Sequence, residues 1–390
     1  MNQSVPKRIA GVTLVELMIA LAIGTLLVLG LVQVFAASRA AYQMSEGMSR
    51  VQENARFAMD FVQRDLRMAG HFGCSTDQSH LLDTSASAGN RFELHFPAPV
   101  SYPVDFTVSV QGYEAASTEP GQTAEIGDFA DGWAPLLPLA ISELGVLEGS
   151  DVLVLRYLHG EGVPVETLTV SGGQTVVSVD PGRWDVLTAG GVNQPLLFGL
   201  SDCHQADIFA VAAAGVSAGA GTVTAAGGGI GARYGASGGV FTNYGETQLR
   251  LFRAESIVYY VGTGASGMPA LFKARSNGGA YEPMELVEGI ESMQLLYGLD
   301  VSSSGPRGYV TEHYTAEELG VDPDKWLTVG MIQVGFLAAS PDPAAAPAAA
   351  GSLSYPNALG VNFDPGVIND GRYRTSYETT VALRNRLFGN

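Results

Sequence analysis

The pattern of apolar and polar positions changes sharply close to the start of the chain. Residues 1–11 are short, polar and basic, whereas residues 12–37 are almost wholly apolar, with Glu16 as the main charged exception. About 20 apolar residues in a helix span a bilayer core, so residues 12–37 predict a transmembrane helix. Lys7 and Arg8 precede this segment and are expected to stay on the cytoplasmic side.

Beyond the apolar segment, the pattern stays helical but becomes amphipathic over residues 38–70. No proline interrupts residues 12–70, and Gly70 is a natural C-terminal stop for a helix. The apolar positions recur at steps of three and four: Met44, Met48, Val51, Ala55, Ala58, Val62, Leu66 and Ala69. The sequence therefore predicts one helix over residues 12–69, about 85 Å long, whose second half packs an apolar stripe on the remainder of the chain.

Residues 71–390 show short apolar or alternating runs between turn residues, which are typical of β-strands. Thr315 and Glu318 have capping-box spacing and predict a short helical turn. Two low-complexity stretches, residues 212–239 and 338–351, are interpreted as loops. The predicted strands are 91–96, 104–110, 151–158, 175–179, 207–212, 248–261, 270–274, 290–297, 329–338 and 377–383. A long helix followed by a large β-rich head is an α+β fold.

Composition and charge narrow the class of protein. Hydrophobic residues make up 46% of the chain and charged residues only 15%, so the chain can bury a core. The formal net charge is −18, and without Lys7 and Arg8, which precede the apolar segment, it is −20 (19 basic against 39 acidic residues). Such a surface repels phosphate backbones, so nucleic-acid binding by the head is not expected.

The two cysteines, Cys74 and Cys203, are interpreted as one disulfide, because an exported protein with two lone cysteines favours oxidation. The bond would close a loop of 129 residues (203 − 74). A zinc site is the alternative, since His71 and His204 lie beside the cysteines and complete a ligand set that zinc accepts. The spacing of these four residues is not that of a zinc finger.

Glu16 is the most informative residue of the apolar segment. A carboxylate in the middle of a membrane span costs about 2.5–3.5 kcal/mol on insertion scales, so it should have a partner and a function. If the chain is cut after Gly11, the new amine of Val12 lies four residues away in the same chain or on an adjacent subunit. Glu16 can then neutralise the amine of a neighbouring helix and set its register. The alternative is a plain membrane anchor in which Glu16 has no role.

Residues 7–11 followed by residues 12–20 resemble the prepilin leader of type IV pilins and type II secretion pseudopilins. The resemblance implies that a membrane prepilin peptidase cuts after Gly11 and methylates the amine of Val12, and that Glu16 acts in assembly. Val12 departs from the commonest residue at its position, phenylalanine. The implied organisation is a leader (1–11), a transmembrane helix (12–37), an amphipathic continuation (38–70) and a β-rich head (71–390).

The head resembles the W-type minor pilins of type IV pilus biogenesis in four segments: 151–157, 202–211, 288–300 and 372–386. This resemblance implies a subunit that primes pilus assembly together with other minor pilins, the major pilin and a large tip adhesin, and so supports motility and adhesion. It implies a single pass through the inner membrane with a periplasmic head, followed by incorporation into a surface pilus. The alternative is a J-type pseudopilin of type II secretion, which shares the leader but is usually much shorter.

Two short segments match enzyme motifs but lack the secondary structure that each motif requires. Residues 262–267 match GxGxxG but are followed by Pro269 and another strand, whereas a dinucleotide site needs a helix there. Residues 235–239 match GxSxG inside a glycine-rich tract with no elbow helix after it. We therefore expect no catalytic activity, cofactor, small-molecule substrate or metal ion.

Overall fold

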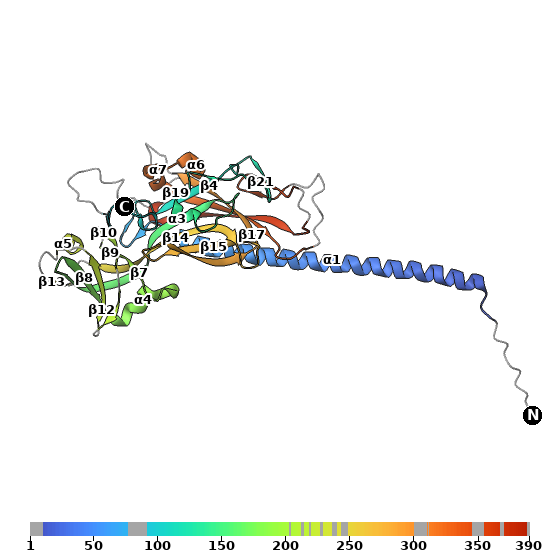
Figure 1. Ribbon diagram of the computed structural model, residues 1–390, viewed down its shortest axis with the longest axis horizontal. Helices are drawn as coiled ribbons and strands as arrows, with labels where there is room; N and C mark the ends of the chain where they lie inside the picture. The colour runs from blue at the N-terminus through green and yellow to red at the C-terminus, as the bar shows by residue number, and fades with distance from the viewer. Residues whose placement is uncertain are drawn as a thin grey trace, which may run out of the picture.

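The computed structural model describes residues 11–76, 92–202, 204–211, 214–217, 220–226, 229–235, 240–242, 249–299, 310, 312–344, 355–366 and 370–387. Its dominant feature is helix α1 (Leu14–Leu66), which projects far beyond the head (Figure 1). The 53 residues of α1 extend over about 80 Å at 1.5 Å per residue. The prediction of one uninterrupted helix is confirmed, with each end a few residues inside the expected bounds.

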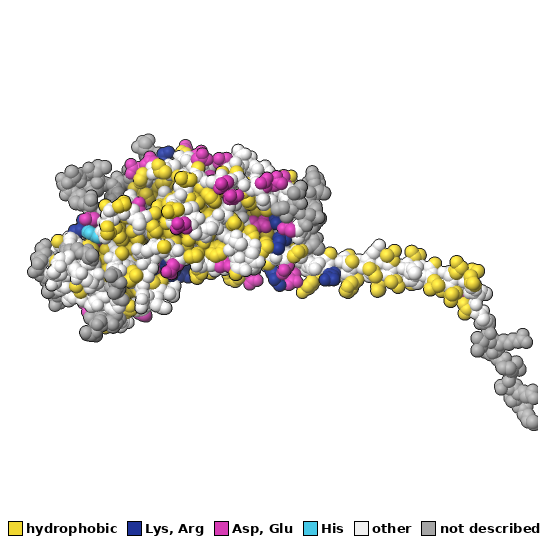
Figure 2. Space-filling model, in the orientation of Figure 1, with side chains coloured by type: hydrophobic (Ala, Val, Ile, Leu, Met, Phe, Trp, Pro, Cys, Tyr) yellow, Lys and Arg dark blue, Asp and Glu magenta, His cyan; other side chains and the backbone are white. Residues whose placement is uncertain are grey.

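The two halves of α1 have different surroundings. The N-terminal half is exposed along its whole length, and Figure 2 shows its apolar side chains standing clear of the head. The C-terminal half buries one stripe on the head, formed by Gly47, Val51, Ala55, Ala58, Met59, Val62, Asp65 and Leu66. Steps of three and four residues place these positions on one face of the helix, as predicted for Val51, Ala55, Ala58, Val62 and Leu66. The prediction is wrong for Met48, which is exposed, because Gly47 packs against Ala344 at that turn.

Two long strands, β7 (Val152–Ser171) and β14 (Arg250–Thr263), form the centre of the largest sheet and pair antiparallel. The other pairs of neighbouring strands in this sheet are also antiparallel, except β10 and β3, which run parallel. The other strands described in this sheet are β3 (Phe92–His95), β4 (Val110–Ala115), β6 (Trp133–Ala134), β8 (Gln174–Val179), β9 (Leu197–Ser201), β10 (Ala206–Ala210), β11 (Ala214–Ser217), β12 (Ala220–Ala226), β13 (Val240–Thr242), β15 (Pro269–Ser276) and β16 (Tyr281–Glu288).

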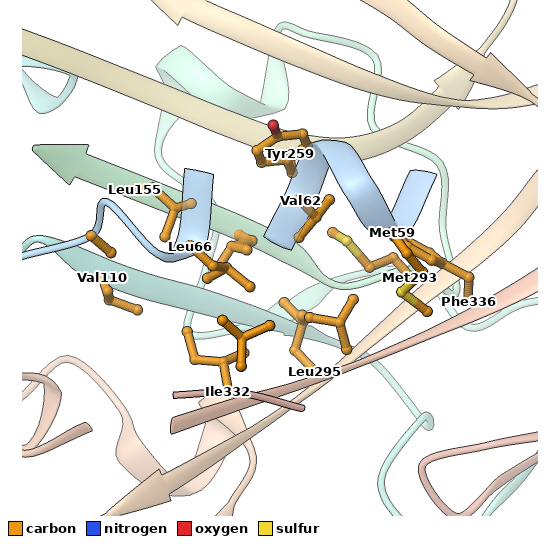
Figure 3. Close-up of a cluster of buried hydrophobic side chains, with 14 of the residues drawn as sticks. Met59, Val62, Leu66, Val110, Leu155, Tyr259, Met293, Leu295, Ile332 and Phe336 are labelled. Atoms are coloured by element: carbon orange, nitrogen blue, oxygen red, sulfur yellow. The ribbon is translucent and has the colours of Figure 1, made fainter. Parts of the chain in front are cut away.

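A second sheet lies across the helix from the first. Its described strands run antiparallel in the order β18 (Glu312–Tyr314), β17 (Ile290–Leu299), β19 (Val329–Ala339) and β22 (Arg374–Ala382). Figure 3 shows α1 side chains meeting both sheets, with Leu155 and Tyr259 from the first and Leu295, Ile332 and Phe336 from the second. The buried stripe of α1 is therefore the middle layer of the main hydrophobic core.

The head also has a separate core at the end farthest from the projecting helix. The second half of β7 leaves the main core and pairs there with β8 and β13. Val165, Leu168, Val177 and Val223 are buried in this distal lobe, together with Leu251 from β14. Figure 1 places this distal lobe at the opposite end of the molecule from the projecting part of α1.

Short elements complete the described fold. The remaining strands are β1 (His71–Phe72), β2 (Ser75–Thr76), β5 (Thr123–Glu125), β20 (Asn357–Ala358) and β21 (Val361–Asp364). The short helices are α3 (Leu139–Ser142), α4 (Trp184–Thr188), α5 (Gly229–Arg233), α6 (Ala316–Leu319), α7 (Pro323–Leu327) and α8 (Arg384–Leu387), with 3₁₀ turns at Tyr102–Val104, Pro181–Arg183 and Ala189–Gly191. The capping box of Thr315 and Glu318 is present at the start of α6, as predicted.

The predicted strand at residues 104–110 is wrong. The segment makes a 3₁₀ turn and irregular backbone, and the strand begins only at Val110. The cause is the buried guanidinium of Arg156, which donates hydrogen bonds of 3.0 Å to the carbonyl oxygens of Val108 and Tyr102. Because Arg156 satisfies these carbonyls, the segment packs Phe106 into the core without joining a sheet.

The interpretation of residues 212–239 as a loop is also wrong for the part that the structure describes. This stretch supplies β11, β12 and α5, and β12 pairs with β8 over six residues. Sheet pairing uses backbone groups, so small side chains do not prevent it. Gly221 shows the use of a small residue here, because a Cβ at that position would lie 2.8 Å from the ring of Trp184.

Candidate functional site

The start of α1 contains the residues that the sequence singles out for processing and assembly. Gly11 and Val12 precede the helix, and the side chain of Val12 is 75% exposed. A Cβ added at Gly11 would meet no atom within 4 Å. A side chain at position 11 would therefore meet no described atom. Residues 1–10 lie outside the described part of the chain.

Glu16 has a partner within its own helix. Thr13 is the N-cap of α1, and the backbone N–H of Glu16 donates to its hydroxyl oxygen at 3.2 Å. The Glu16 carboxylate accepts in return from the backbone N–H of Thr13 at 3.0 Å and from its hydroxyl at 2.9 Å. This reciprocal pair is a capping box. Sequence reasoning missed it, although a threonine three residues before a glutamate is its usual signal.

The exposed half of α1 is long and apolar enough to cross a membrane. Its large side chains expose between about half and three quarters of their surface, for example Leu14, Leu31 and Phe35. An exposed apolar surface of this size marks contact with a membrane or with another protein. Gly24 and Gly30 have no neighbouring atoms that a Cβ would meet, so the helix surface is open at both positions.

A buried polar cluster fixes the other half of α1 to the head. Asp65 is only 6% exposed and accepts hydrogen bonds from the hydroxyls of Tyr157 (3.1 Å, β7) and Tyr259 (2.5 Å, β14). The ammonium group of Lys273 on β15 lies 2.5 Å from the same carboxylate. Burial, reinforced by the charge of Asp65, raises the pKa of both tyrosines, so their hydroxyls keep their protons and donate.

The C-terminal segment of the chain closes the end of α1. The side-chain amide of Asn385 donates to the carbonyl oxygens of Arg67 at 3.1 Å and Ala69 at 3.2 Å. Arg67 is the C-cap of α1 and Ala69 lies in the turn after it, so the amide satisfies carbonyl oxygens at and just beyond the end of the helix. Arg386 is buried and donates to the carbonyl of Trp326 at 2.7 Å and to the hydroxyl of Ser109 at 2.7 Å. Residues 372–386, singled out by resemblance, therefore have a structural role at the base of the helix.

The structure describes only one of the two cysteines of the predicted disulfide. Cys74 is disulfide-bonded, whereas Cys203 lies outside the described residues, so their pairing stays a prediction. The zinc alternative loses the free thiolate of Cys74 that it needs. His71 Nδ1 donates to the carbonyl oxygen of Leu158 at 2.7 Å, and burial lowers the pKa of the ring.

Glu93, His95 and Asp207 are the described residues whose ligand-type atoms gather within 4.8 Å of one another. The guanidinium of Arg233 lies among them, with Nη1 2.7 Å from Glu93 Oε2 and Nε 2.7 Å from Asp207 Oδ1. His95 Nε2 is 2.6 Å from the same aspartate oxygen. The arginine supplies the positive charge that a metal ion would bring, so this cluster is a salt-bridge network between β3, β10 and α5.

Two segments of the chain match known protein families, one at its start and one in its C-terminal half. Residues 6–32 match the family described as the prokaryotic N-terminal methylation motif. Residues 258–385 match the family described as type IV pilus-assembly protein W. The second match runs from within β14 to the start of α8 and includes the second sheet and Asn385.

Solved structures add a match to a type IV-like pilin from Thermus thermophilus. The match has 22% sequence identity, covers 35% of this chain and 70% of that chain, and has a TM-score of 0.21. The assignment therefore does not rest on it. Comparison with curated proteins returned no significant match.

The exposed apolar helix and its N-terminal motif define the class: a pilin-like protein with a prokaryotic N-terminal methylation motif. Within this class, the chain carries a segment, residues 258–385, that matches the family described as type IV pilus-assembly protein W. This is a structural family, and no enzymatic role follows from the matches. The motif also implies processing by a prepilin peptidase.

Proposed function

We propose that this protein is a minor pilin that helps prime type IV pilus assembly within a tip complex of minor pilins and a large adhesin. It would in this way support pilus-dependent motility and adhesion. The observation that carries the proposal is the division of α1: an exposed apolar half that begins with Glu16, joined without a break to a half that is fixed in the head. One half is free to join a bundle of similar helices while the other carries a large head.

The roles of individual residues follow from this proposal. The prepilin peptidase would cut between Gly11 and Val12 and methylate the new amine of Val12. Glu16 would then pair with the amine of a neighbouring subunit during assembly. The open backbone around Gly11 and the position of Glu16 one turn into the helix support both steps.

The proposed organisation is a leader (1–11), a membrane helix (12–37), its amphipathic continuation (38–70) and a head (71–390). Before assembly the chain would span the inner membrane once with its head in the periplasm. It would then enter a surface pilus together with other minor pilins and the major pilin. The disulfide between Cys74 and Cys203 fits this route, because the head would fold in an oxidising compartment.

The alternative, a J-type pseudopilin, shares the leader and the exposed helix. The match of residues 258–385 to type IV pilus-assembly protein W favours the pilus system. Deletion of the gene decides between the two. We expect loss of surface pili and twitching with unchanged type II secretion of exoenzymes, and restoration by the wild-type gene. Loss of exoenzyme secretion with normal piliation would establish the pseudopilin instead.

A further inference from the structure

A groove opens beside α1, on the face of the largest sheet that packs against this helix. Lys273 and Arg275 lie opposite Tyr259 and Ile257 in the register of β15 and β14, so their side chains point to the same face. The groove has a volume of about 560 Å³, which is in the range of ligand-binding clefts. Its lining comes from the loop 191–194, from residues 273, 275 and 277 along β15, and from residues 282–284 of β16.

The loop that forms one wall of the groove is fixed to the sheet at both ends. Asn277 donates to the carbonyl oxygen of Gln194 at 2.7 Å and accepts from the backbone N–H of Leu196 at 2.7 Å. Before the loop, Arg253 Nη1 donates to the carbonyl oxygen of Ala189 at 2.6 Å. The wall is therefore in place before a partner binds, which reduces the entropic cost of binding.

The groove has an excess of positive charge, although the chain as a whole has a net charge of −18. Glu255 is the salt-bridge partner of both Arg253, at 2.6 Å, and Arg275, at 3.0 Å, so one carboxylate serves two guanidinium groups. Arg275 Nη2 makes no hydrogen bond within the described part of the chain. Lys273 uses one of its three donors on Asp65. Two cations that line the groove therefore keep unused donors.

The other side chains of the lining indicate the class of ligand. Asn193 and Gln194 are exposed in the wall and offer amide donors and acceptors. Glu282 is the one acidic residue of the described lining, and it lies opposite Arg275 on β16 without forming a salt bridge to it. The described lining contains no aromatic ring on which a base could stack. Amides beside two cations suit an extended peptide that carries a carboxylate.

The groove adjoins exposed aromatic rings of α1. Steps of three and four residues place Asn54, Phe57, Phe61 and Asp65 along one side of the helix. Asn54 donates to a backbone carbonyl of β16 at 3.0 Å and Asp65 contacts Lys273 of β15, so this side borders the strands that line the groove. Phe57 and Phe61 are 48% and 40% exposed. A subunit that packs along the exposed part of α1 would therefore lie next to the groove.

We propose that the groove receives an acidic peptide segment of a neighbouring pilin-like subunit. An aspartate or glutamate of this segment pairs with Arg275 and Lys273, and the amides of Asn193 and Gln194 bind its backbone. The inference rests on the proposed role in assembly, since assembly brings a neighbouring subunit to α1. Complementary charge of this kind determines which partner docks and in which register.

Site-specific photo-crosslinking of the full chain in cells tests the groove. Benzoylphenylalanine replaces the exposed Asn193 in the wall, and in a second strain it replaces Leu21, which is 61% exposed in the apolar half of α1. We expect the probe at position 193 to crosslink to an acidic segment of a pilin-like subunit, identified by mass spectrometry. Arg275→Gln should lower the yield about 10-fold, because it removes a charge-assisted hydrogen bond. Glu282→Gln should raise the yield, because it removes a repelling charge.

Arg56→Gln is the matched control, since Arg56 is 82% exposed on α1 outside the groove and the change removes the same charge. It should leave the yield unchanged. Gln194→Glu adds a repelling charge at an exposed position of the wall, and it decides the question if Arg275→Gln fails to fold.

Crosslinks to pilin-like subunits from position 21 but none from position 193 would overturn the groove and leave the role in assembly standing. An undiminished yield in folded Arg275→Gln and Gln194→Glu, or a crosslinked segment without an acidic residue, would overturn it as well. Crosslinks from neither position would contradict both the groove and the role in assembly.

Discussion

At the scale of single residues, Glu16 has one observed role and one proposed role, and chemistry can separate them. In the free subunit its carboxylate completes the capping box with Thr13 and so defines where α1 begins. In the proposed assembly its negative charge neutralises an amine of a neighbouring chain. Glutamine accepts the same capping hydrogen bonds but carries no charge. Alanine can neither accept these hydrogen bonds nor carry a charge.

We predict that Glu16→Gln and Glu16→Ala are both expressed and processed but fail to enter pili, because both lack the charge. Thr13→Val removes the hydroxyl of the capping box and keeps the charge, so it should assemble, with helix stability lowered by about 1 kcal/mol. Piliation and twitching of strains that carry each variant are the measurement. Normal piliation with Glu16→Gln would show that the cap, and not the charge, is what assembly needs.

At the scale of elements, the attachment of α1 to the head combines an apolar stripe with one buried charge. An apolar stripe of small residues such as Ala55 and Ala58 tolerates small displacements. The contacts of Asp65 do not tolerate such displacements. Its hydrogen bonds to Tyr157 and Tyr259 and its contact with Lys273 can form at only one position of α1 relative to the head. The cluster therefore fixes both the depth and the rotation of the helix in its groove.

Asp65→Ala is predicted to lower the free energy of unfolding by about 3–5 kcal/mol, because the change leaves Lys273 buried without its partner. Asp60→Ala is the control on the same helix. Asp60 is 65% exposed and lies 4.0 Å from Arg56, so its loss should cost no more than about 0.5 kcal/mol. Chemical denaturation of the solubilised chain measures both values. Equal losses for the two variants would contradict the proposed role of Asp65.

Some elements of the fold can be predicted from the sequence, whereas others depend on contacts that the sequence does not show. The long helix, its buried stripe and most strands follow from local periodicity, and so does the hairpin at residues 262–267. The turn at residues 102–108 depends on Arg156, which is 48 to 54 residues away in sequence, and local pattern cannot show it. The partners of Asp65 likewise lie 92 to 208 residues away in sequence. Polar contacts between residues far apart in sequence are thus the part of the structure that local sequence patterns cannot predict.

At the scale of the whole molecule, the main core and the core of the distal lobe share the strands β7 and β14. The main core holds α1, and the distal lobe lies beyond it. The predicted disulfide joins Cys74, just after the helix, to the connection between β9 and β10. Such a bond closes a loop of 129 residues (203 − 74), for which chain entropy gives up to about 5 kcal/mol.

We predict that Cys74→Ser lowers the free energy of unfolding by about 2–5 kcal/mol. If the two cysteines form one bond, Cys203→Ser and the double variant should lose the same amount, since each removes the same crosslink. Thiol titration of the denatured, unreduced wild type should find no reactive cysteine. Additive losses in the double variant, or a free thiol in the wild type, would contradict the pairing.

The 20-residue strand β7 has a mechanical consequence for a subunit at the end of a fibre. It runs from the core around α1 into the distal lobe, so a pull on that lobe is carried through β7 to the helix (Figure 1). Such a pull acts along the β7–β14 pair, whose backbone hydrogen bonds extend from Leu153 to Pro164. Bonds loaded in shear must break together, whereas bonds at the end of a hairpin open one after another. In the proposed tip complex, the head would in this way transmit tension between a surface contact and the shaft.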